Sequence, residues 1–593
     1  MRSLIRLTLV LAFLSYPAAA DAVTYYVNSA HGSASDANAG TDSALPWRTL
    51  HRAVDGISTN ETGGSGGPYT PATCGDTVIV SSGTYTDNTA AGSPSATIKY
   101  NPTNSCTAGN PLTFEIAAGA TVTVGRNLDP GDDWRQNPVI GCGTRNYITW
   151  KGFTLAAGTD ARANNSTGCI LDRLTINKGC ASSPGSGNYV GIYIDTSTDT
   201  IVRNTTISNI YDTDGSADQN GACVMSYDST GTLFHNNRLD NCDTAIFDKR
   251  NGTNNIYEKN YITDANQWAI YVNTENAAAC GTCPVSGLIF RYNVVYGFEA
   301  GIRYIAGNST NAQIYNNTFL GTSGLSRLGF TANPESTGAS PRYSFYNNIV
   351  IVDQNHSNSS RGHQQHDASA GPPSTTEMLS NYNNYYGLGG ASATFQPQAG
   401  GTIQNLATWD DTGHDVNSIT SDPAFSASVS PPAAVTAFRL DAMSAAINAG
   451  RTGGTSGGSA VNMGAYLTDN DEIGPSAQTD VTDPVVTITT PTSNPTYGPV
   501  SSTPISIAGS CTDAGGVSSV TWVNAAGGSG TASGTTSWSA NVGLTSGSNA
   551  VTVTCTDTSA NDSTDVITVT YTPPGGTGTG LPAILPRRIS PGD

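Results

Sequence analysis

Charged side chains are scarce in this sequence: they form 12% of 593 residues, and 45 acidic residues face only 26 lysines and arginines. Beyond the N-terminus no apolar run is long enough to span a bilayer, so no membrane span is expected. The formal net charge of −19 would repel phosphates, which argues against nucleic acid as a partner. The same charge attracts no polyanion, so an acidic ligand would need a local basic patch or a bound cation.

Glycine is abundant instead, with 66 residues, and Ser, Thr and Asn dominate the polar content. This composition is typical of strands and turns and predicts an all-β fold. Residues 1–22 have the features of a signal peptide: Arg2 and Arg6 flank a short apolar run, Leu7–Leu14, and small residues follow at 18–20. We therefore expect a secreted protein, extracellular, periplasmic or at the cell surface, and a monomer.

Eleven cysteines agree with export, because oxidising compartments preserve disulfides. We expect four pairs: Cys511–Cys555, Cys74–Cys106, Cys169–Cys180 and Cys223–Cys242. Cys280-Gly-Thr-Cys283 has the spacing of a zinc or redox motif, but no second Cys or His pair accompanies it. A local loop disulfide is the favoured interpretation there.

An internal repeat carries the fold prediction. Seven segments place polar residues between apolar ones, and their last apolar residues are separated by 23 to 33 residues. These anchors are Ile176, Ile207, Leu239, Ile262, Val295, Phe319 and Val350. The spacing suits one turn of a β-solenoid with loops of variable length.

An asparagine stands two residues before each of the last five anchors, at Asn237, Asn260, Asn293, Asn317 and Asn348. A solenoid stacks equivalent residues about 4.8 Å apart. Stacked amides can then hydrogen-bond along the axis, and asparagine tolerates the left-handed bend between strands. The alternative is a series of asparagine-rich surface turns without stacking.

A second strand precedes each repeat, and its alternation separates an inner from an outer face. The inner residues are Ile192, Val224, Ile246, Ile270 and Ile302. One outer row is Tyr193, Met225, Phe247, Tyr271 and Arg303, and the next is Asp195, Tyr227, Lys249, Asn273 and Ile305. Arg250 and Glu275 follow at the adjoining turns, so aromatic, basic, acidic and amide groups gather on consecutive coils.

Residues 23–467 resemble the secreted pectate-lyase-like β-helix proteins. The motifs that carry this resemblance are Tyr25-Tyr-Val-Asn, Ser35-Asp-Ala-Asn-Ala-Gly40 and Pro46-Trp-Arg-Thr-Leu-His-Arg-Ala-Val54 at the start, and Asp422-Pro-Ala-Phe425, Ala445-Ala-Ile-Asn-Ala-Gly450 and Asn462-Met-Gly-Ala-Tyr466 at the end. The resemblance implies a right-handed parallel β-helix whose first coil is plugged by a cap with a short helix. It is weak for chemistry, because that superfamily includes lyases, hydrolases, epimerases and adhesins.

Within this family a polysaccharide lyase fits the outer face best. Elimination from a uronic acid needs its carboxylate neutralised and a base for the C5 proton, and the resemblance implies Lys or Arg as that base. Lys249 is the candidate base and Arg303 the carboxylate clamp, because its planar fork matches a carboxylate. Tyr227 and Tyr271 are candidate proton donors or sugar platforms. Further candidate substrate-binding residues are Tyr193, Asp195, Arg250, Asn273 and Glu275.

Three alternatives remain open at this point. The outer face could be a solvated surface whose charges only maintain solubility. The protein could be a non-catalytic glycan-binding, adhesin or structural β-helix protein. It could also be a glycoside hydrolase or C5-epimerase on the same scaffold.

A possible calcium loop lies at Asp212-Thr-Asp214-Gly-Ser-Ala-Asp218, where alternate carboxylates surround a glycine turn. It departs from the EF-hand pattern and also partly resembles the Asn-Thr-Asp motif of polygalacturonases, whose later motifs are missing here. Calcium bound by Asp212, Asp214 and Asp218 is one interpretation, and an ordinary acidic turn is the other.

The C-terminal part predicts a separate small domain. Residues 468–483 form a polar linker, and residues 574–593 form a disordered tail rich in Gly, Pro and Thr. Between them, residues 484–573 resemble a bacterial immunoglobulin-like domain with strands near 485–489, 504–509, 517–523, 536–542 and 549–555. Trp522 and the Cys511–Cys555 pair would lie in its core.

Overall fold

A computed structural model describes residues 22–59, 65–86, 99–126, 138–181, 189–212, 221–273, 284–305, 310–321, 330–333, 343–353, 361–365, 378–388, 394–396, 405–410, 413–429, 434–452, 459–468, 471–475, 484–513, 517–557 and 562–574. It divides into two compact units, and the boundary along the chain falls after residue 477. Within the described residues no helix is long and apolar enough to cross a membrane.

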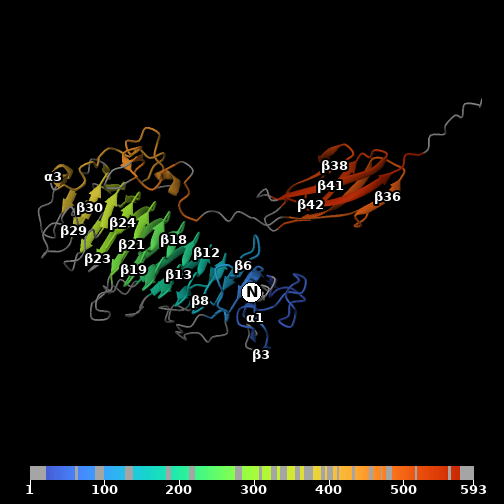
Figure 1. Cartoon of the computed structure of the whole chain (residues 1–593), viewed down its shortest axis with the longest axis horizontal. Helices are drawn as coiled ribbons and strands as arrows, with labels where there is room; N and C mark the ends of the chain where they lie inside the picture. Colours follow the sequence, from blue (N-terminus) through green and yellow to red (C-terminus); the bar gives the residue numbers. More distant parts are fainter. Residues whose placement is uncertain are drawn as a thin grey trace, which may run out of the picture. The chain divides into compact units, whose positions relative to one another are not determined.

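The first unit is a solenoid of stacked parallel strands, drawn from blue to orange in Figure 1. One sheet has twelve strands in sequence order: β1 (Thr24–Val27), β4 (Thr77–Val80), β6 (Leu112–Ile116), β9 (Ile148–Lys151), β12 (Ile170–Asp172), β15 (Ile201–Arg203), β18 (Leu233–His235), β20 (Ile256–Glu258), β22 (Ile289–Arg291), β24 (Ala312–Tyr315), β27 (Tyr343–Tyr346) and β30 (Met378–Asn381). We call it sheet A.

The other eighteen strands form one bent sheet with two rows. One row is β5 (Gly83–Tyr85), β7 (Val122–Val124), β10 (Thr154–Leu155), β13 (Thr175–Ala181), β16 (Thr206–Asp212), β25 (Thr318–Leu320), β28 (Ile349–Asp353) and β31 (Asn384–Leu388). The other is β8 (Pro138–Gly143), β11 (Asp160–Asn164), β14 (Tyr189–Asp195), β17 (Gly221–Tyr227), β26 (Phe330–Asn333), β29 (Arg361–Gln365) and β32 (Thr394–Gln396). Three long strands, β19 (Arg238–Lys249), β21 (Tyr261–Asn273) and β23 (Val294–Ile305), run through both rows. We call the second row the site row.

The predicted inner residues of the site row fill the solenoid. Ile192, Val224 and Ile246 are in register and fully buried, and Ile270 and Ile302 continue the same line. Aromatic residues of sheet A, such as Phe234, Tyr257 and Phe290, face them from β18, β20 and β22. The two-residue period of a strand therefore places one apolar stack per sheet in the core.

The predicted asparagine ladder is confirmed and is longer than expected. Asn237 Nδ2 donates to Asn260 Oδ1 at 3.1 Å, and the same contact recurs through Asn293, Asn317 and Asn348 at 3.0 Å each. It continues to Asn383 at 3.2 Å and ends on Asp415 Oδ1 at 2.8 Å. Each ladder oxygen also accepts a backbone N–H from the preceding coil, for example Asn237 N to Asn260 Oδ1 at 2.9 Å. All six amides are buried, so their hydrogen bonds replace water that is excluded there.

The N-terminal cap contains the expected short helix, α1 (Leu50–Val54), next to a small antiparallel pair, β2 (Ile57–Thr59) and β3 (Ser65–Pro68). Thr49 caps the helix by accepting a hydrogen bond from Arg52 N. The Arg52 guanidinium lies 4.2 Å from the ring of Trp47, which stacks on Tyr25 at 4.4 Å. These contacts close the first coil.

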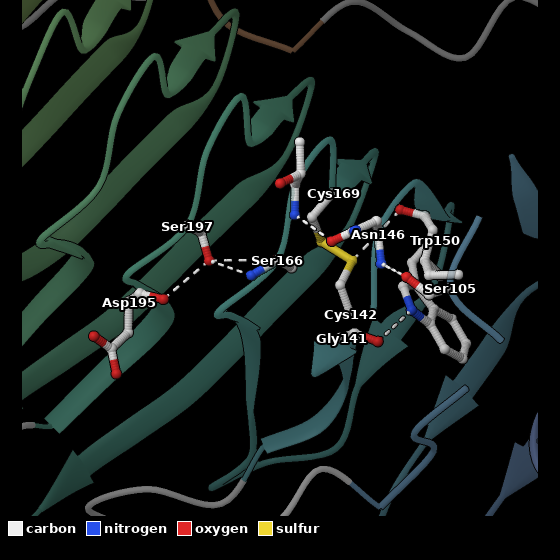
Figure 2. Close-up of a disulfide and its surroundings, with 11 residues drawn as sticks. Ser105, Gly141, Cys142, Asn146, Trp150, Ser166, Cys169, Asp195 and Ser197 are labelled. Atoms are coloured by element: carbon white, nitrogen blue, oxygen red, sulfur yellow. Dashed lines mark hydrogen bonds between the residues drawn. A yellow bond between two sulfur atoms is a disulfide. The ribbon is translucent and has the colours of Figure 1, made fainter. Parts of the chain in front are cut away.

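Four disulfides are present among the described residues, and they correct one prediction. Cys74–Cys106, Cys223–Cys242 and Cys511–Cys555 pair as expected. Cys169 pairs with Cys142 and not with Cys180 (Figure 2). Register explains the difference, because Cys142 is the second-last residue of β8 and Cys169 precedes β12 one coil later, with their Cα atoms 5.9 Å apart. Cys280 and Cys283 lie outside the described residues.

Polar contacts pack closely around this disulfide. Trp150 Nε1 donates to Gly141 O at 2.9 Å, and Asn146 N donates to Ser105 Oγ at 3.1 Å (Figure 2). One coil further, Ser166 N donates to Ser197 Oγ at 3.2 Å. The bridge therefore joins successive coils where backbone and side-chain hydrogen bonds already fix their spacing.

The last part of the first unit folds back over the outside of the solenoid. It contains α3 (Leu406–Asp410), a 3-10 turn (Val435–Phe438) and the pair β33 (Gly450–Arg451) and β34 (Ala460–Val461). Phe438, Met463 and Ile473 pack against Tyr261 and Val294 of the solenoid. Ile473 is 6% exposed and Gly474 N donates to Lys259 O at 2.8 Å, so the start of the predicted linker packs on the first unit instead.

The second unit has a three-stranded sheet, β35 (Val485–Thr490), β37 (Ile505–Thr512) and β40 (Ser537–Val542), and a five-stranded sheet, β36 (Thr496–Val500), β42 (Asp562–Tyr571), β41 (Gly547–Asp557), β38 (Val517–Asn524) and β39 (Ser529–Thr531). Its core holds the Cys511–Cys555 disulfide and Trp538, which is 3% exposed. Trp522 is only partly buried, so the core tryptophan is Trp538 and not Trp522. Its immunoglobulin-like identity stays a prediction.

Candidate functional site

The site row brings the predicted outer residues together as a ladder. Tyr193 is the register partner of Met225, which is followed by Phe247 and Tyr271 on the next two strands. The second ladder runs through Asp195, Tyr227 and Lys249 in the same way. The backbone of Arg303 continues the first ladder beside Tyr271. The predicted neighbourhood is therefore correct at the level of the backbone.

The first ladder is not an open surface. Tyr193 and Tyr271 are 7% exposed, Phe247 is 2% exposed and Met225 is fully buried. These side chains form a second apolar cluster outside the main core, together with Trp268. Phe247 stacks on Tyr271 with ring centroids 4.5 Å apart, so one face of Tyr271 is already occupied. The expected exposure of this ladder is thus wrong, because its rings pack on one another along the axis.

Lys249 ends β19 and lies between two aromatic rings. Its Nζ is 5.2 Å from the ring centroid of Phe247 and 5.6 Å from that of Tyr227. The residue is only 8% exposed. An ammonium group over aromatic faces is attracted by their negative charge density. The candidate base is therefore held by its neighbours at the edge of the apolar cluster.

Arg250 forms the best-defined ion pair of the site. Its Nη2 and Nε lie 2.6 Å and 3.0 Å from Asp228 Oδ2, and Asn251 Nδ2 donates to Asp228 Oδ1 at 2.7 Å. The guanidinium also lies 4.2 Å from the ring centroid of Tyr227. Arg250 and Asn251 both have left-handed backbone angles, φ 52° and 45°. The turn after Lys249 thus directs Arg250 back over the preceding coil.

The coils before Tyr227 add a third cation, Arg162, which the sequence analysis did not single out. Arg162 lies one strand before Tyr193, with its guanidinium 4.8 Å from that ring and its Nη2 3.6 Å from Asp195 Oδ2. Burial, followed by the nearby Asp195 carboxylate, raises the pKa of Tyr193 to about 12. The Tyr193 hydroxyl therefore stays protonated at neutral pH and can donate a hydrogen bond.

Some predicted residues cannot be placed. The side chains of Arg303, Asn273 and Asp212 lie outside the described residues, as do Glu275, Asp214 and Asp218 entirely. In the part of the chain that the structure describes, no three His, Cys, Asp or Glu residues gather as a metal-ion ligand set. Calcium at the Asp212 loop therefore stays a prediction.

Together the described residues form an ionic and aromatic cluster, which we call the site cluster. It consists of Arg162, Tyr193, Asp195, Tyr227, Asp228, Lys249 and Arg250. Three cations and two carboxylates thus gather around two tyrosines in a chain whose net charge is −19. Arg162 and Asp228 were missed in the sequence. Arg162 had a signal, because Asp160-Ala-Arg-Ala-Asn164 alternates like the later strands of the site row.

The outward face of sheet A differs in character. Its register places ions of alternating sign side by side, and neighbouring pairs bond directly. Lys151 Nζ lies 2.7 Å from Glu115, Arg203 Nη2 lies 3.0 Å from Asp172, and Arg291 Nη2 lies 2.6 Å from Glu258. The Arg291 guanidinium also lies 5.4 Å from the ring centroid of Tyr292 and 5.9 Å from that of Tyr315, so the Arg203–Asp172 pair is the one used as a control. This face supplies matched control residues for the site cluster.

A protein-family model agrees with this architecture. The model of the family "Right handed beta helix region" matches residues 141–358. A crystal structure of pectate lyase Pel9A is similar at 15% identity and a TM-score of 0.31, over 75% of this chain and 96% of that one. A rhamnogalacturonan lyase structure is similar at 12% identity and a TM-score of 0.29, over 55% and 82%. No curated protein sequence matches the chain. The family match therefore identifies residues 141–358 as a right-handed β-helix region.

Proposed function

We propose that this chain is an exported polysaccharide lyase that cleaves a uronic-acid-containing glycan at the site cluster. The observation that carries the proposal is the gathering of Arg162, Lys249 and Arg250 around Tyr193 and Tyr227 in an acidic protein. An acidic glycan needs local cations to bind to such a chain, and the site cluster supplies them. Four disulfides support an exported protein.

The chemistry follows from the roles of these groups. Arg250, and Arg303 as the predicted clamp, would neutralise the uronate carboxylate, which acidifies the C5 proton. Lys249 Nζ in its neutral form would accept this proton, the C4–O bond would break, and a C4–C5 double bond would form. The departing oxygen needs a proton, and the hydroxyl of Tyr227, beside Lys249 and Arg250, is the candidate donor.

A second candidate function is glycan binding without catalysis. The observation that favours it is the low exposure of Lys249 and Tyr271, together with the stacking of Tyr271 on Phe247. A base that is packed in this way needs a substrate that reaches Nζ past its neighbours. A binding protein needs only the exposed edge of the cluster.

One assay separates the candidates. The full-length protein is incubated with pectate, alginate and glycosaminoglycans, with calcium or with a chelator, and ultraviolet absorbance of the unsaturated product is followed. Absorbance supports the lyase, reducing ends without absorbance indicate a hydrolase, and retention on a glycan gel without cleavage indicates a binding protein. The proposal is overturned if the protein cleaves none of these acidic glycans and is retained by none of them.

A further inference from the structure

A buried carboxylate lies directly behind the site cluster. Asp248 is the residue before Lys249 on β19, and its side chain points to the opposite face, into the solenoid. It is fully buried. Its Oδ2 accepts hydrogen bonds from Tyr257 OH at 3.0 Å and from Asn255 Nδ2 at 3.1 Å. Its Oδ1 has no hydrogen-bond partner. A charged carboxylate in this position is poorly compensated.

The turn that carries Arg250 closes over this unpartnered oxygen. Gly252 lies so near that a Cβ atom there would be 2.3 Å from Asp248 Oδ1. Between them, Arg250 and Asn251 hold left-handed angles that are unfavourable for residues with a side chain. The contact of this turn with the interior therefore depends on whether the Asp248 carboxyl group is neutral or ionised.

The surroundings of Asp248 are otherwise neutral. Its neighbours on the same inward line are Ser226 on β17 and Val272 on β21, and Asn255 and Tyr257 contact it from the next turn and from β20. Among the described residues Tyr257 is the one titratable group that touches it, and burial raises the pKa of Tyr257 well above its ordinary value. Lys249 and Arg250 belong to the outer face.

We propose that Asp248 is a protonation-dependent positioning residue for the turn 249–252: its neutral form keeps the turn closed on the interior, and its ionised form loosens it. The consequence for Lys249 and Arg250 as catalytic groups rests on the proposed function. The effect on the turn itself does not. Asp248 touches no substrate, so it acts only through the backbone that it shares with the site cluster.

The direction of the effect follows from linkage. Burial raises the pKa of Asp248 from 3.8 to about 6, and the two donated hydrogen bonds only partly oppose this. An opened turn exposes Asp248 to water and restores its ordinary acidity. Opening therefore becomes easier as the pH rises from about 4 to about 6 and is constant above that. A shift of this size corresponds to a change in the opening equilibrium of about 100-fold.

The test compares wild type with Asp248→Asn, which is neutral at every pH and nearly isosteric. Hydrogen exchange of the backbone amides 249–252 is measured by mass spectrometry at pH 3 and pH 8, as the ratio of the two proteins so that the intrinsic pH dependence cancels. We expect nearly equal exchange at pH 3, below both pKa values of Asp248, and up to about 100-fold faster exchange in wild type at pH 8. Asp199→Asn, an exposed carboxylate on an earlier turn, is the control and should give a ratio of one at both values.

Activity provides a separate readout. On whichever acidic glycan the lyase assay identifies, Asp248→Asn should lower KM at pH 8, and it should lower KM by a smaller factor at pH 5. A KM ratio that does not change with pH, with the exchange difference present, would overturn the link to the site cluster. An exchange ratio that is the same at both pH values would overturn the inference while the proposed function stands. If no glycan is cleaved, the proposed function fails and hydrogen exchange still decides the role of Asp248.

Discussion

The Arg250 side chain bonds to Asp228 on the preceding coil, with Nη2 2.6 Å from Oδ2, while its guanidinium covers the ring of Tyr227 at 4.2 Å. One arginine thus fixes an acid and an aromatic ring that are neighbours in sequence and belong to another turn of the solenoid. Both partners are less than a quarter exposed as side chains, so the pair is only weakly screened.

Arg250→Lys should weaken glycan binding without unfolding the protein. A lysine keeps the charge but loses the planar fork and the stacking on Tyr227. We expect KM, or Kd for a non-cleaved glycan, to rise roughly 5- to 20-fold, which corresponds to about 1–2 kcal/mol. Arg203→Lys is the matched control, because Arg203 pairs with Asp172 on the outward face of sheet A. An equal loss in both variants would contradict the assignment of the site cluster.

Lys249→Met should abolish turnover if Lys249 is the base. Methionine retains most of the apolar stem beside Phe247 and Tyr227, so the Tm should change little, whereas kcat should fall by at least about 100-fold. Lys249→Ala is less informative, because it also removes packing at a residue that is 8% exposed. Turnover retained in Lys249→Met would transfer the base role to another residue.

Asn293→Ala should destabilise the solenoid strongly. The Asn293 amide donates to Asn317 Oδ1 and Tyr257 O, and its own oxygen accepts from Asn260. Its removal leaves buried partners unsatisfied, at a cost of about 2–4 kcal/mol. The exposed Asn177, whose Oδ1 accepts a hydrogen bond from Asn209, is the control, and Asn177→Ala should cost less than about 1 kcal/mol. Denaturant unfolding of both variants provides the comparison.

Peptide mapping without reduction should recover Cys142 linked to Cys169. Their Cα separation of 5.9 Å lies within the normal range of a disulfide. The double variant Cys142→Ser with Cys169→Ser should lose about 2–4 kcal/mol of stability, because the unfolded chain regains the entropy of a closed loop. A recovered Cys169–Cys180 peptide would show that the coils are joined differently.

The stacking of coils could be predicted from sequence, whereas the exposure of the site could not. Asn237 and Asn260 recur at one position of a repeat, and any parallel stack brings such residues into register. The burial of Tyr271 depends on which side chains fold against it, and the alternation of one strand carries no information about that. Cys169 shows the same limit, since its partner depends on the register of adjacent coils and not on proximity in sequence.

Arg162 combines one feature that could be predicted from the sequence with one that could not. Its strand alternates like its successors, so its outward direction could be read from the sequence. Its approach to Tyr193 and Asp195 needed the pairing of β11 with β14, which sequence alone leaves unspecified.

The side-chain bonds of the asparagine ladder have a direction, because each Oδ1 accepts from the N-terminal side and each Nδ2 donates to the side chain of the next coil, although every Nδ2 also donates to a backbone carbonyl of the preceding coil. Aligned amide groups add their dipoles, as they do along an α-helix, with the positive end at the last donor. Asp415 lies at that end, and its carboxylate also accepts from Ser380, Trp409 and Ser418. A carboxylate at the positive end of the dipole offers no donor to continue the row, so the ladder of side-chain hydrogen bonds ends at Asp415.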